Sequence, residues 1–330
     1  PVVLANVVVD GPDGPAPLAA PSLILERAVA PGSPSLRVGL LGLTPPQITT
    51  WDRRILAGQV HARDLVEAAR EQVGLLREDG ADLVVALCHS GLGPEEHQTL
   101  MENAAVPVAA IPGIDAVIAG HSHEVFPGPD RLPSAVVDPV RGRVHGVPLV
   151  QPGAYGSHVG VIDLALERRD GRWAVEGATA RTLQVTPRGT PPEALTARAD
   201  PLLMAIAAPI HTRLQAAADE PVGQAEVALH TYLAMVAGSP ALDVVADAQR
   251  IHAGRVLRGT AAEDLPILAA VAPFRAGGRG GPANYVDVAP GAIVRRDVAG
   301  LYVFPNGVAI VEITGAGLRD WLERGASAFR

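Results

Sequence analysis

Between residues 36 and 120, short apolar runs alternate with a segment of helical periodicity, and this alternation constrains the fold most strongly. Residues 36–43, 81–88 and 114–119 are nearly all apolar, as in strands whose two sheet faces are both covered. Residues 65–76 carry apolar side chains at helical spacing, which predicts a helix. The pattern predicts an α/β fold with a parallel sheet and places chemistry at the carboxyl ends of its strands.

After residue 147 the pattern of apolar residues changes. Residues 159–166 and 173–178 are apolar runs that flank an Asp-Gly pair, which is typical of a tight antiparallel hairpin. Residues 187–192 are rich in Pro and precede an Ala- and Leu-rich helical pattern. We therefore expect two domains joined by a linker helix, with the boundaries 1–187, 188–218 and 219–330.

The second domain is predicted to mix helices and strands. Ser239-Pro240 is typical of a helix start, because a hydroxyl can cap the first turn and Pro suits the first helical position. A last helix is expected around Trp321. Strands are predicted at the apolar runs 265–272, 301–304 and 308–313.

The composition excludes several classes of protein. The 35 Gly and 30 Pro indicate many loops, but the chain shows no internal repeat, which excludes collagen and solenoids. A net charge of −8 leaves no basic footprint for a nucleic-acid polymer. The single cysteine, Cys88, excludes an internal disulfide. No apolar run approaches the ~18 residues that a membrane-spanning helix needs. The sequence also shows no sign of an obligate protein partner.

Three histidines directly follow two of the predicted strands. His89 comes after the strand at 81–88, and His121 and His123 follow the next one, with a short helix predicted between them at 95–104. Carboxyl ends of parallel strands share one sheet edge, so we expect these imidazoles to lie together. Imidazole suits Zn, Mn, Fe or Co, which makes the cluster a candidate metal site. The alternative is that each ring only satisfies backbone groups of a Gly-rich loop.

A pair of metal ions also needs anionic oxygens, and the sequence shows no carboxylate in a suitable place. Asp82 and Asp115 precede their strands, so they are expected at the opposite edge of the sheet. Glu124 and Asp130 follow the histidine pair and could reach back to it, but Phe126-Pro127-Gly128-Pro129 is expected to carry that loop away. The histidines therefore predict a metal-capable cluster and not a complete dinuclear centre.

A glycine-rich segment of the second domain is a candidate anion-binding loop. Gly277 and Gly278 precede Arg279, so backbone N–H groups and a guanidinium could approach a phosphate or carboxylate. A flexible surface loop is the alternative. Phe304 could stack on a nucleobase, or it could be an ordinary core aromatic side chain.

Short motifs along nearly the whole chain occur in the order found in one family. They include His89-Ser90-Gly91, Pro112-Gly113-Ile114-Asp115, Gly120-His121-Ser122-His123, Gln151-Pro152-Gly153-Ala154-Tyr155-Gly156, residues 272–282 and residues 301–306. The chain resembles the 5'-nucleotidase family, and within it the bifunctional 2',3'-cyclic-nucleotide 2'-phosphodiesterase/3'-nucleotidase branch. The resemblance implies a calcineurin-like metallophosphoesterase sandwich joined by a linker helix to an α+β nucleotide-binding domain.

The resemblance also implies roles for the histidines. His89, His121 and His123 would be ligands of two divalent metal ions such as Zn, Mn or Co. His123 separates this branch from relatives that have Gln at the corresponding position. The two ions would activate a water molecule for in-line attack on phosphorus.

Substrate binding is implied for the second domain. Arg279 would contact the phosphate or ribose of a small-molecule nucleotide, while Gly277 and Gly278 would let the ligand approach. Phe304 would form one side of a base-stacking clamp, at a position where the branch more often has Tyr. Phe in place of Tyr keeps an aromatic face for stacking.

Several motifs of the family do not occur in the chain. Its Asp-x-His, Gly-Asp and Gly-Asn-His-Glu segments, which supply further ligands and the catalytic histidine, would lie before Pro1. The second aromatic of the base clamp would lie after Arg330. We therefore expect the chain to be a fragment that is truncated at both ends. Such a fragment would hold no catalytic residue of its own and would be inactive alone. The family implies a periplasmic or secreted parent protein.

The expected activity of the parent is hydrolysis of 2',3'-cyclic nucleotides and 3'-nucleotides. One alternative is a non-catalytic nucleotide-binding module, which would bind equally well in the presence of a chelator. Another is a family relative that hydrolyses 5'-nucleotides or nucleotide sugars, which a substrate panel would reveal.

Overall fold

The chain folds into two compact units, which are considered separately. The computed structural model describes residues 2–29, 31–56, 58–129, 131–186, 199–278, 281, 283–304 and 306–327. The units are Pro1–Ala197 and Arg198–Arg330, and the division falls inside the expected linker at 188–218.

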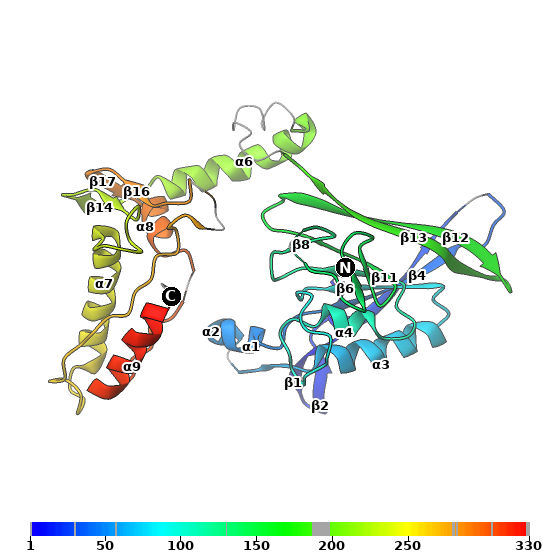
Figure 1. Cartoon of the computed structure of the whole chain (residues 1–330), viewed down its shortest axis with the longest axis horizontal. Coiled ribbons are helices and arrows are strands. Elements are labelled where there is room, and N and C mark those ends of the chain that lie inside the picture. The colour runs from blue at the N-terminus through cyan, green and yellow to red at the C-terminus, as the bar shows by residue number, and fades with distance from the viewer. Residues whose placement is uncertain are drawn as a thin grey trace. The chain divides into compact units, whose positions relative to one another are not determined.

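Unit 1 consists mainly of strands (Figure 1). Its elements are β1 (Val7–Gly11), β2 (Gly14–Pro17), β3 (Ser22–Arg27), β4 (Leu36–Leu43), α1 (Ile48–Trp51), α2 (Arg53–Leu56), β5 (Val60–Ala62), α3 (Leu65–Glu78), β6 (Leu83–Cys88), α4 (Ala105–Ala109), β7 (Ala116–Ala119), β8 (Val125–Phe126), β9 (Val137–Asp138), β10 (Arg143–Val144), β11 (Val147–Pro152), β12 (His158–Arg169) and β13 (Arg172–Gln184).

A mixed sheet forms the centre of unit 1. Its strand order is β3-β4-β6-β7-β11-β10-β9, with β8 paired to β11. The strands β4, β6, β7 and β11 are parallel, and Cys88 lies opposite both Leu43 and Ala119. The three strands predicted from apolar runs are therefore confirmed. Their shared direction brings the residues that follow β6 and β7 to the same edge of the sheet.

Helices cover one face of this sheet, and a long hairpin covers the other (Figure 1). The predicted helix is present as α3, and its Leu76 packs so closely on β4 that a Cβ at Gly39 would lie 3.1 Å from a Leu76 methyl group. The β12–β13 hairpin is also confirmed. Asp170 and Gly171 both have positive φ, which a tight two-residue turn requires.

The helix predicted at residues 95–104 is wrong. This segment is an irregular loop, and α4 begins only at Ala105. The backbone of the loop uses its hydrogen-bonding groups on distant partners: Leu100 N–H donates to Asp64, and the Glu102 carbonyl accepts from Ser90. Long-range contacts therefore replace the helical i to i−4 pattern.

Unit 2 contains four helices and two short antiparallel ribbons among its described residues. Residues 188–198 of the expected linker helix lie outside the described residues, and a helix is present after them from Pro201. The elements are α6 (Pro201–Ala218), β14 (Pro221–Ala225), β15 (Leu229–His230), α7 (Pro240–Leu257), β16 (Asp287–Val288), β17 (Gly291–Val294), α8 (Arg295–Leu301) and α9 (Gly315–Ala326).

The strands predicted at 265–272, 301–304 and 308–313 are wrong. In the described part of unit 2, β14 pairs with β17 and β15 pairs with β16, and none of the three apolar runs joins a sheet. A strand is defined by its partner, so an apolar run without one stays irregular. The helix predicted at Ser239-Pro240 is present as α7, although the Ser239 hydroxyl donates to the His230 carbonyl, 2.7 Å away, and does not cap the helix.

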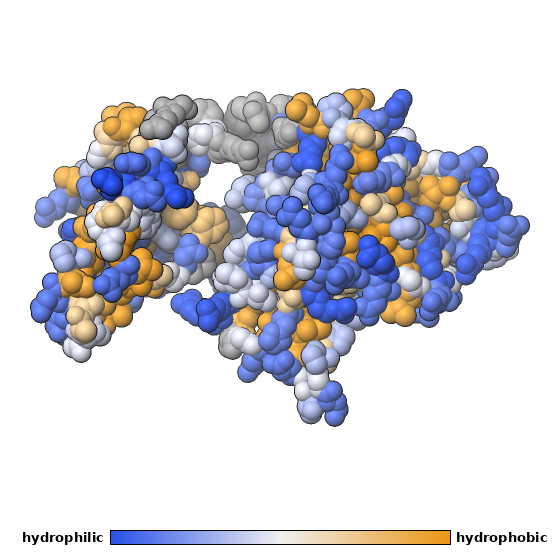
Figure 2. Space-filling model, turned by 60° about the horizontal axis from the view of Figure 1, so that its bottom comes forward, coloured by the Kyte–Doolittle hydropathy of each residue, from blue (hydrophilic) through white to orange (hydrophobic). Residues whose placement is uncertain are grey.

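Unit 2 leaves much apolar surface open. A cavity of about 1420 Å³ lies between α7, α9 and the apolar segments 265–271 and 306–315. Trp321 and Leu322 of α9 are 51% and 67% exposed. Hydrophobic side chains are visible at the surface of this unit in Figure 2. Among the described helices of the whole chain, none has both the length and the hydropathy that crossing a membrane requires.

Candidate metal centre at the strand ends

The ends of β6 and β7 bring two of the three predicted histidines together. His89 directly follows β6, and its backbone N–H donates to the Leu43 carbonyl at the end of β4, 2.9 Å away. His121 follows β7. The two imidazole rings meet edge to face with their centroids 5.6 Å apart. His89 and His121 therefore lie near each other, as their positions after neighbouring parallel strands predict.

A strained turn presents the histidine pair. His121 and His123 both have positive φ, of 68° and 60°, a conformation that costs a residue with a side chain about 1–2 kcal/mol. The Ser122 N–H donates to the Gly120 carbonyl, and the fully buried Gln151 amide donates to the Ser122 hydroxyl, 2.8 Å away. These bonds hold the turn in its unusual conformation.

The ring of His123 contacts an aromatic side chain, Tyr155. Its ring lies 5.8 Å from the ring of Tyr155, centroid to centroid. Among the described residues, no three side chains of His, Cys, Asp or Glu are grouped closely enough to hold a metal ion. The histidines of this chain can supply some of the ligands of a metal centre, because imidazole binds ions such as Zn. They do not surround an ion on their own.

Charge and burial favour a neutral imidazole at His89. Partial burial lowers the pKa of His89 below its ordinary value, and the nearby His121 and His123 lower it further because like charges repel. A histidine must be neutral to bind a metal, so the lowered pKa suits a ligand. Burial raises the pKa of the neighbouring Cys88 thiol to about 12, against a weaker opposing hydrogen bond with Ser90, so Cys88 offers no thiolate.

The sequence analysis missed a carboxylate at this site, Glu102. Its Oε1 lies 2.7 Å from Nε2 of His121. The indole ring of Trp51 stacks on the same imidazole, with centroids 5.2 Å apart and an angle of 21° between the planes. No local pattern marks Glu102, because the contact depends on how residues 92–104 fold back over the sheet edge.

Of the other acidic residues considered, Asp82 and Asp115 lie as expected, whereas Glu124 does not. The Asp82 carboxylate accepts from the backbone of Arg37, and Asp115 accepts from the backbone of Val84, so both belong to the opposite edge of the sheet. Glu124 turns back toward the histidine loop and accepts from the Ser122 hydroxyl at 3.4 Å. Asp130 lies outside the described residues.

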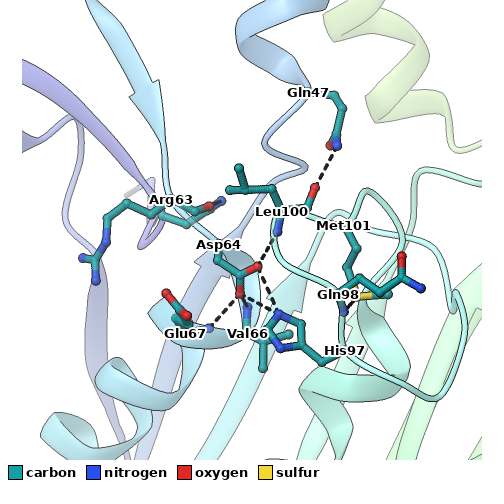
Figure 3. A network of polar contacts seen from close by, with 10 residues as sticks. Gln47, Arg63, Asp64, Val66, Glu67, His97, Gln98, Leu100 and Met101 are labelled. Carbon is teal, nitrogen blue, oxygen red and sulfur yellow. Dashed lines mark hydrogen bonds and ion pairs between the residues drawn. The ribbon is translucent and has the colours of Figure 1, made fainter.

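A buried carboxylate, Asp64, anchors the loop that carries Glu102 (Figure 3). Asp64 caps α3 by accepting from Val66 and Glu67, and it also accepts from Leu100 N–H at 2.7 Å. The Nε2 of His97 lies 3.0 Å from both of its oxygens.

The pKa of Asp64 reflects these contacts. Burial alone would raise its pKa, but hydrogen bonds from the Glu67 backbone, the His97 ring and the Leu100 backbone outweigh that effect and hold the pKa below its ordinary value. Asp64 is therefore an ionised anchor for the loop.

The predicted substrate residues of unit 2 are described only in part. Gly277 and Gly278 have positive φ, and a Cβ at Gly277 would lie 2.7 Å from the Tyr285 hydroxyl, so that position requires Gly. Arg279 lies outside the described residues. Phe304 is 54% exposed and contacts the ring of Phe274 edge to face, with centroids 5.5 Å apart. An exposed ring of this kind is available for stacking.

Comparisons with known proteins identify the class. Residues 221–329 match the model of the "5'-nucleotidase, C-terminal domain". The structure of the Bacillus subtilis calcineurin-like phosphoesterase YfkN superposes with a TM-score of 0.56 at 32% identity, over 64% of this chain and 62% of that one. A putative 5'-nucleotidase from Staphylococcus aureus, at 19% identity, shares the fold with a TM-score of 0.58 over 93% of this chain and 51% of that one. The fold is that of a calcineurin-like phosphoesterase with a 5'-nucleotidase C-terminal domain.

The relatives found by sequence similarity indicate one branch of the family. The chain is 36% identical, over its whole length and 51% of the relative, to the 2',3'-cyclic-nucleotide 2'-phosphodiesterase/3'-nucleotidase of Yersinia enterocolitica. A protein of the same name from Salmonella typhimurium is also 36% identical, over 95% of this chain and 49% of its own length. The resemblance to the 5'-nucleotidase family and to this branch is thereby confirmed. The chain spans about half the length of the curated relatives it matches.

Proposed function

We propose that the complete protein is a metal-dependent phosphohydrolase of 2',3'-cyclic nucleotides and 3'-nucleotides. The observation that carries the proposal is the approach of His89 and His121 from neighbouring strand ends, in a chain similar throughout to enzymes of that name. Parallel strands commonly place functional groups at this edge. The protein would act in the periplasm or outside the cell.

Three residues of this chain would hold divalent ions such as Zn, Mn or Co: His89, His121 and His123. The remaining ligands would come from the part of the complete protein that its relatives have and this chain does not span. A bound divalent ion supplies Lewis-acid polarisation of a phosphoryl oxygen. The role of the chain's own residues is to hold the imidazoles at fixed positions, and the lowered pKa of His89 favours the neutral form of that ring.

Unit 2 would supply the nucleotide site. Arg279 would contact the phosphate or ribose, and Gly277 and Gly278 would leave room for close approach of the backbone. Phe304 would stack on the base, which its exposed ring permits. The substrate is a free nucleotide and not a nucleic-acid polymer, in keeping with the net charge of −8.

A substrate panel with the complete protein tests the proposal. We expect turnover of 2',3'-cyclic AMP and 3'-AMP, loss of turnover in a chelator, and loss of turnover in His121→Ala. The control His211→Ala changes an exposed histidine of α6 in unit 2 and should stay active. Full activity of His121→Ala would contradict the assignment.

The panel also separates the alternatives. Binding of 3'-AMP that is unaffected by the chelator, without turnover under any condition, would identify a non-catalytic nucleotide-binding module. Preferred hydrolysis of 5'-AMP or a nucleotide sugar would instead identify a relative with a different specificity.

A further inference from the structure

The contact between Glu102 and His121 fixes the position of a proton. A carboxylate can only accept, so the hydrogen in the 2.7 Å contact between Oε1 and Nε2 belongs to the imidazole nitrogen. In a neutral ring the other nitrogen, Nδ1, then carries the free lone pair. The His121 side chain is 20% exposed and the Glu102 side chain 42% exposed.

Two aromatic neighbours restrict the orientation of the His121 ring. Trp51 stacks on one face, and the edge-to-face contact with His89 is made at an angle of 65°. A ring packed in this way cannot rotate freely. The stack sets the plane of the ring, and the 2.7 Å contact with Glu102 selects which nitrogen faces the carboxylate.

The fold brings Glu102 to the ring through the turn after His89. The fully buried Ser90 hydroxyl donates to the Glu102 carbonyl, 2.7 Å away, and accepts from the Ala104 N–H at 2.8 Å. The Asn103 side chain accepts from Gly91 N–H at 3.1 Å. The segment that carries Glu102 is thus bonded to the turn that follows His89.

The other end of the loop is held by Asp64 and Gln47 (Figure 3). Asp64 accepts from Leu100 N–H, and Gln47 donates to the Leu100 carbonyl at 2.9 Å. Gln47 immediately precedes α1, whose last residue is the stacking Trp51. Loop and indole are therefore fixed to each other around His121.

We propose that Glu102 is a positioning residue that holds the proton of His121 on Nε2 and so leaves Nδ1 as the nitrogen available to bind a metal ion. Carboxylates that orient metal-binding histidines act in this way and raise the basicity of the ligand. The metal part of the proposal rests on the proposed function. The tautomer part concerns this chain alone.

Nitrogen NMR of the metal-free 330-residue chain tests the tautomer. Histidine is labelled with ¹⁵N, the sample is held at about pH 8, and the His121 signals are assigned by their loss in His121→Asn. We expect a single tautomer protonated at Nε2, and a mixture of tautomers in Glu102→Gln, where an amide can either donate or accept. Glu96→Gln, the same change at an exposed position of the loop, should leave the tautomer unaltered. A proton on Nδ1 in the wild type, or an unchanged tautomer in Glu102→Gln, would overturn the proposal.

Metal affinity of the complete protein tests the second part. Titration with Zn²⁺ should show binding weakened about 10–100-fold in Glu102→Gln and unchanged in Glu96→Gln. Equal affinity in Glu102→Gln would overturn the positioning role. If the tautomer and the affinity behave as expected while no nucleotide is hydrolysed, the proposed function has failed and the role of Glu102 stands.

Discussion

The two units of the chain differ in how they bury apolar side chains. In unit 1 a single buried cluster runs from Ala5 to Leu149 and includes both sides of the α3–sheet contact. In the described part of unit 2 the buried cluster is formed by Leu229, Ala241, Val286 and Val288. Ala225, Ile293 and Leu301 pack against this cluster, while many other apolar side chains there line a cavity or face solvent.

This difference in packing explains which side chains are held at fixed positions. A densely packed core holds its strands in place, and it can hold side chains at strand ends with constant distances. His89 and His121 have that support, as does the strained turn at residues 120–123. In the described part of unit 2, Phe304 and the glycine loop rest on local contacts and on few buried side chains.

The largest expected effect is on core packing. Leu76→Ala in α3 should lower the free energy of unfolding of unit 1 by about 2–5 kcal/mol, because it leaves a cavity against β4. The matched change Leu322→Ala in α9 should cost about 0.5 kcal/mol or less, since that side chain is 67% exposed. Urea unfolding measures both. Equal losses would show that the two units are packed alike.

Two aspartate caps sharpen the comparison at a smaller scale. Asp64→Ala should destabilise α3 by about 2 kcal/mol, because the buried carboxylate caps the helix and also holds the loop at Leu100. Asp200→Ala removes an exposed cap from α6 whose side chain, among the described residues, bonds only to the first turn of that helix, so about 0.5 kcal/mol is expected. Amide hydrogen exchange in each helix distinguishes the two values. A larger loss in α6 would contradict the anchoring role of Asp64.

A still smaller effect is expected on pH dependence. Asp64 ionises at its ordinary pKa of 3.8 in the unfolded chain and at a lower pKa in the folded one. Between those values the unfolded state binds more protons, so the stability that Asp64 contributes is present above pH 3.8 and is lost as the pH falls through the folded pKa. Urea unfolding at pH 7 and about pH 3 should therefore show a smaller loss for Asp64→Asn than for the wild type. Identical losses would mean that Asp64 does not contribute in this way.

The sequence predicted the parallel centre of unit 1, the helix α3 and the β12–β13 hairpin, because the signals for these elements are local. Apolar runs identified β4, β6 and β7, and the strand-end argument brought His89 near His121. Their role as metal ligands stays a prediction. Glu102 could not be found in this way, since its place depends on hydrogen bonds from residues far away in the sequence.

In unit 2 the same reasoning failed for the strands. An apolar run at 308–313 has the composition of a strand, but in the described residues no neighbouring strand pairs with it. Composition records the tendency of a segment to be buried, whereas pairing depends on which other segments reach it.

The metal content of the complete protein tests the central claim most directly. Wild type, His89→Ala and His145→Ala, a histidine in the β10–β11 turn, are purified in parallel, and bound Zn and Mn are counted by mass spectrometry. We expect the wild type and His145→Ala to retain divalent metal and His89→Ala to lose a substantial share of it. A full metal content in His89→Ala would contradict the assignment of the strand-end histidines as a metal centre.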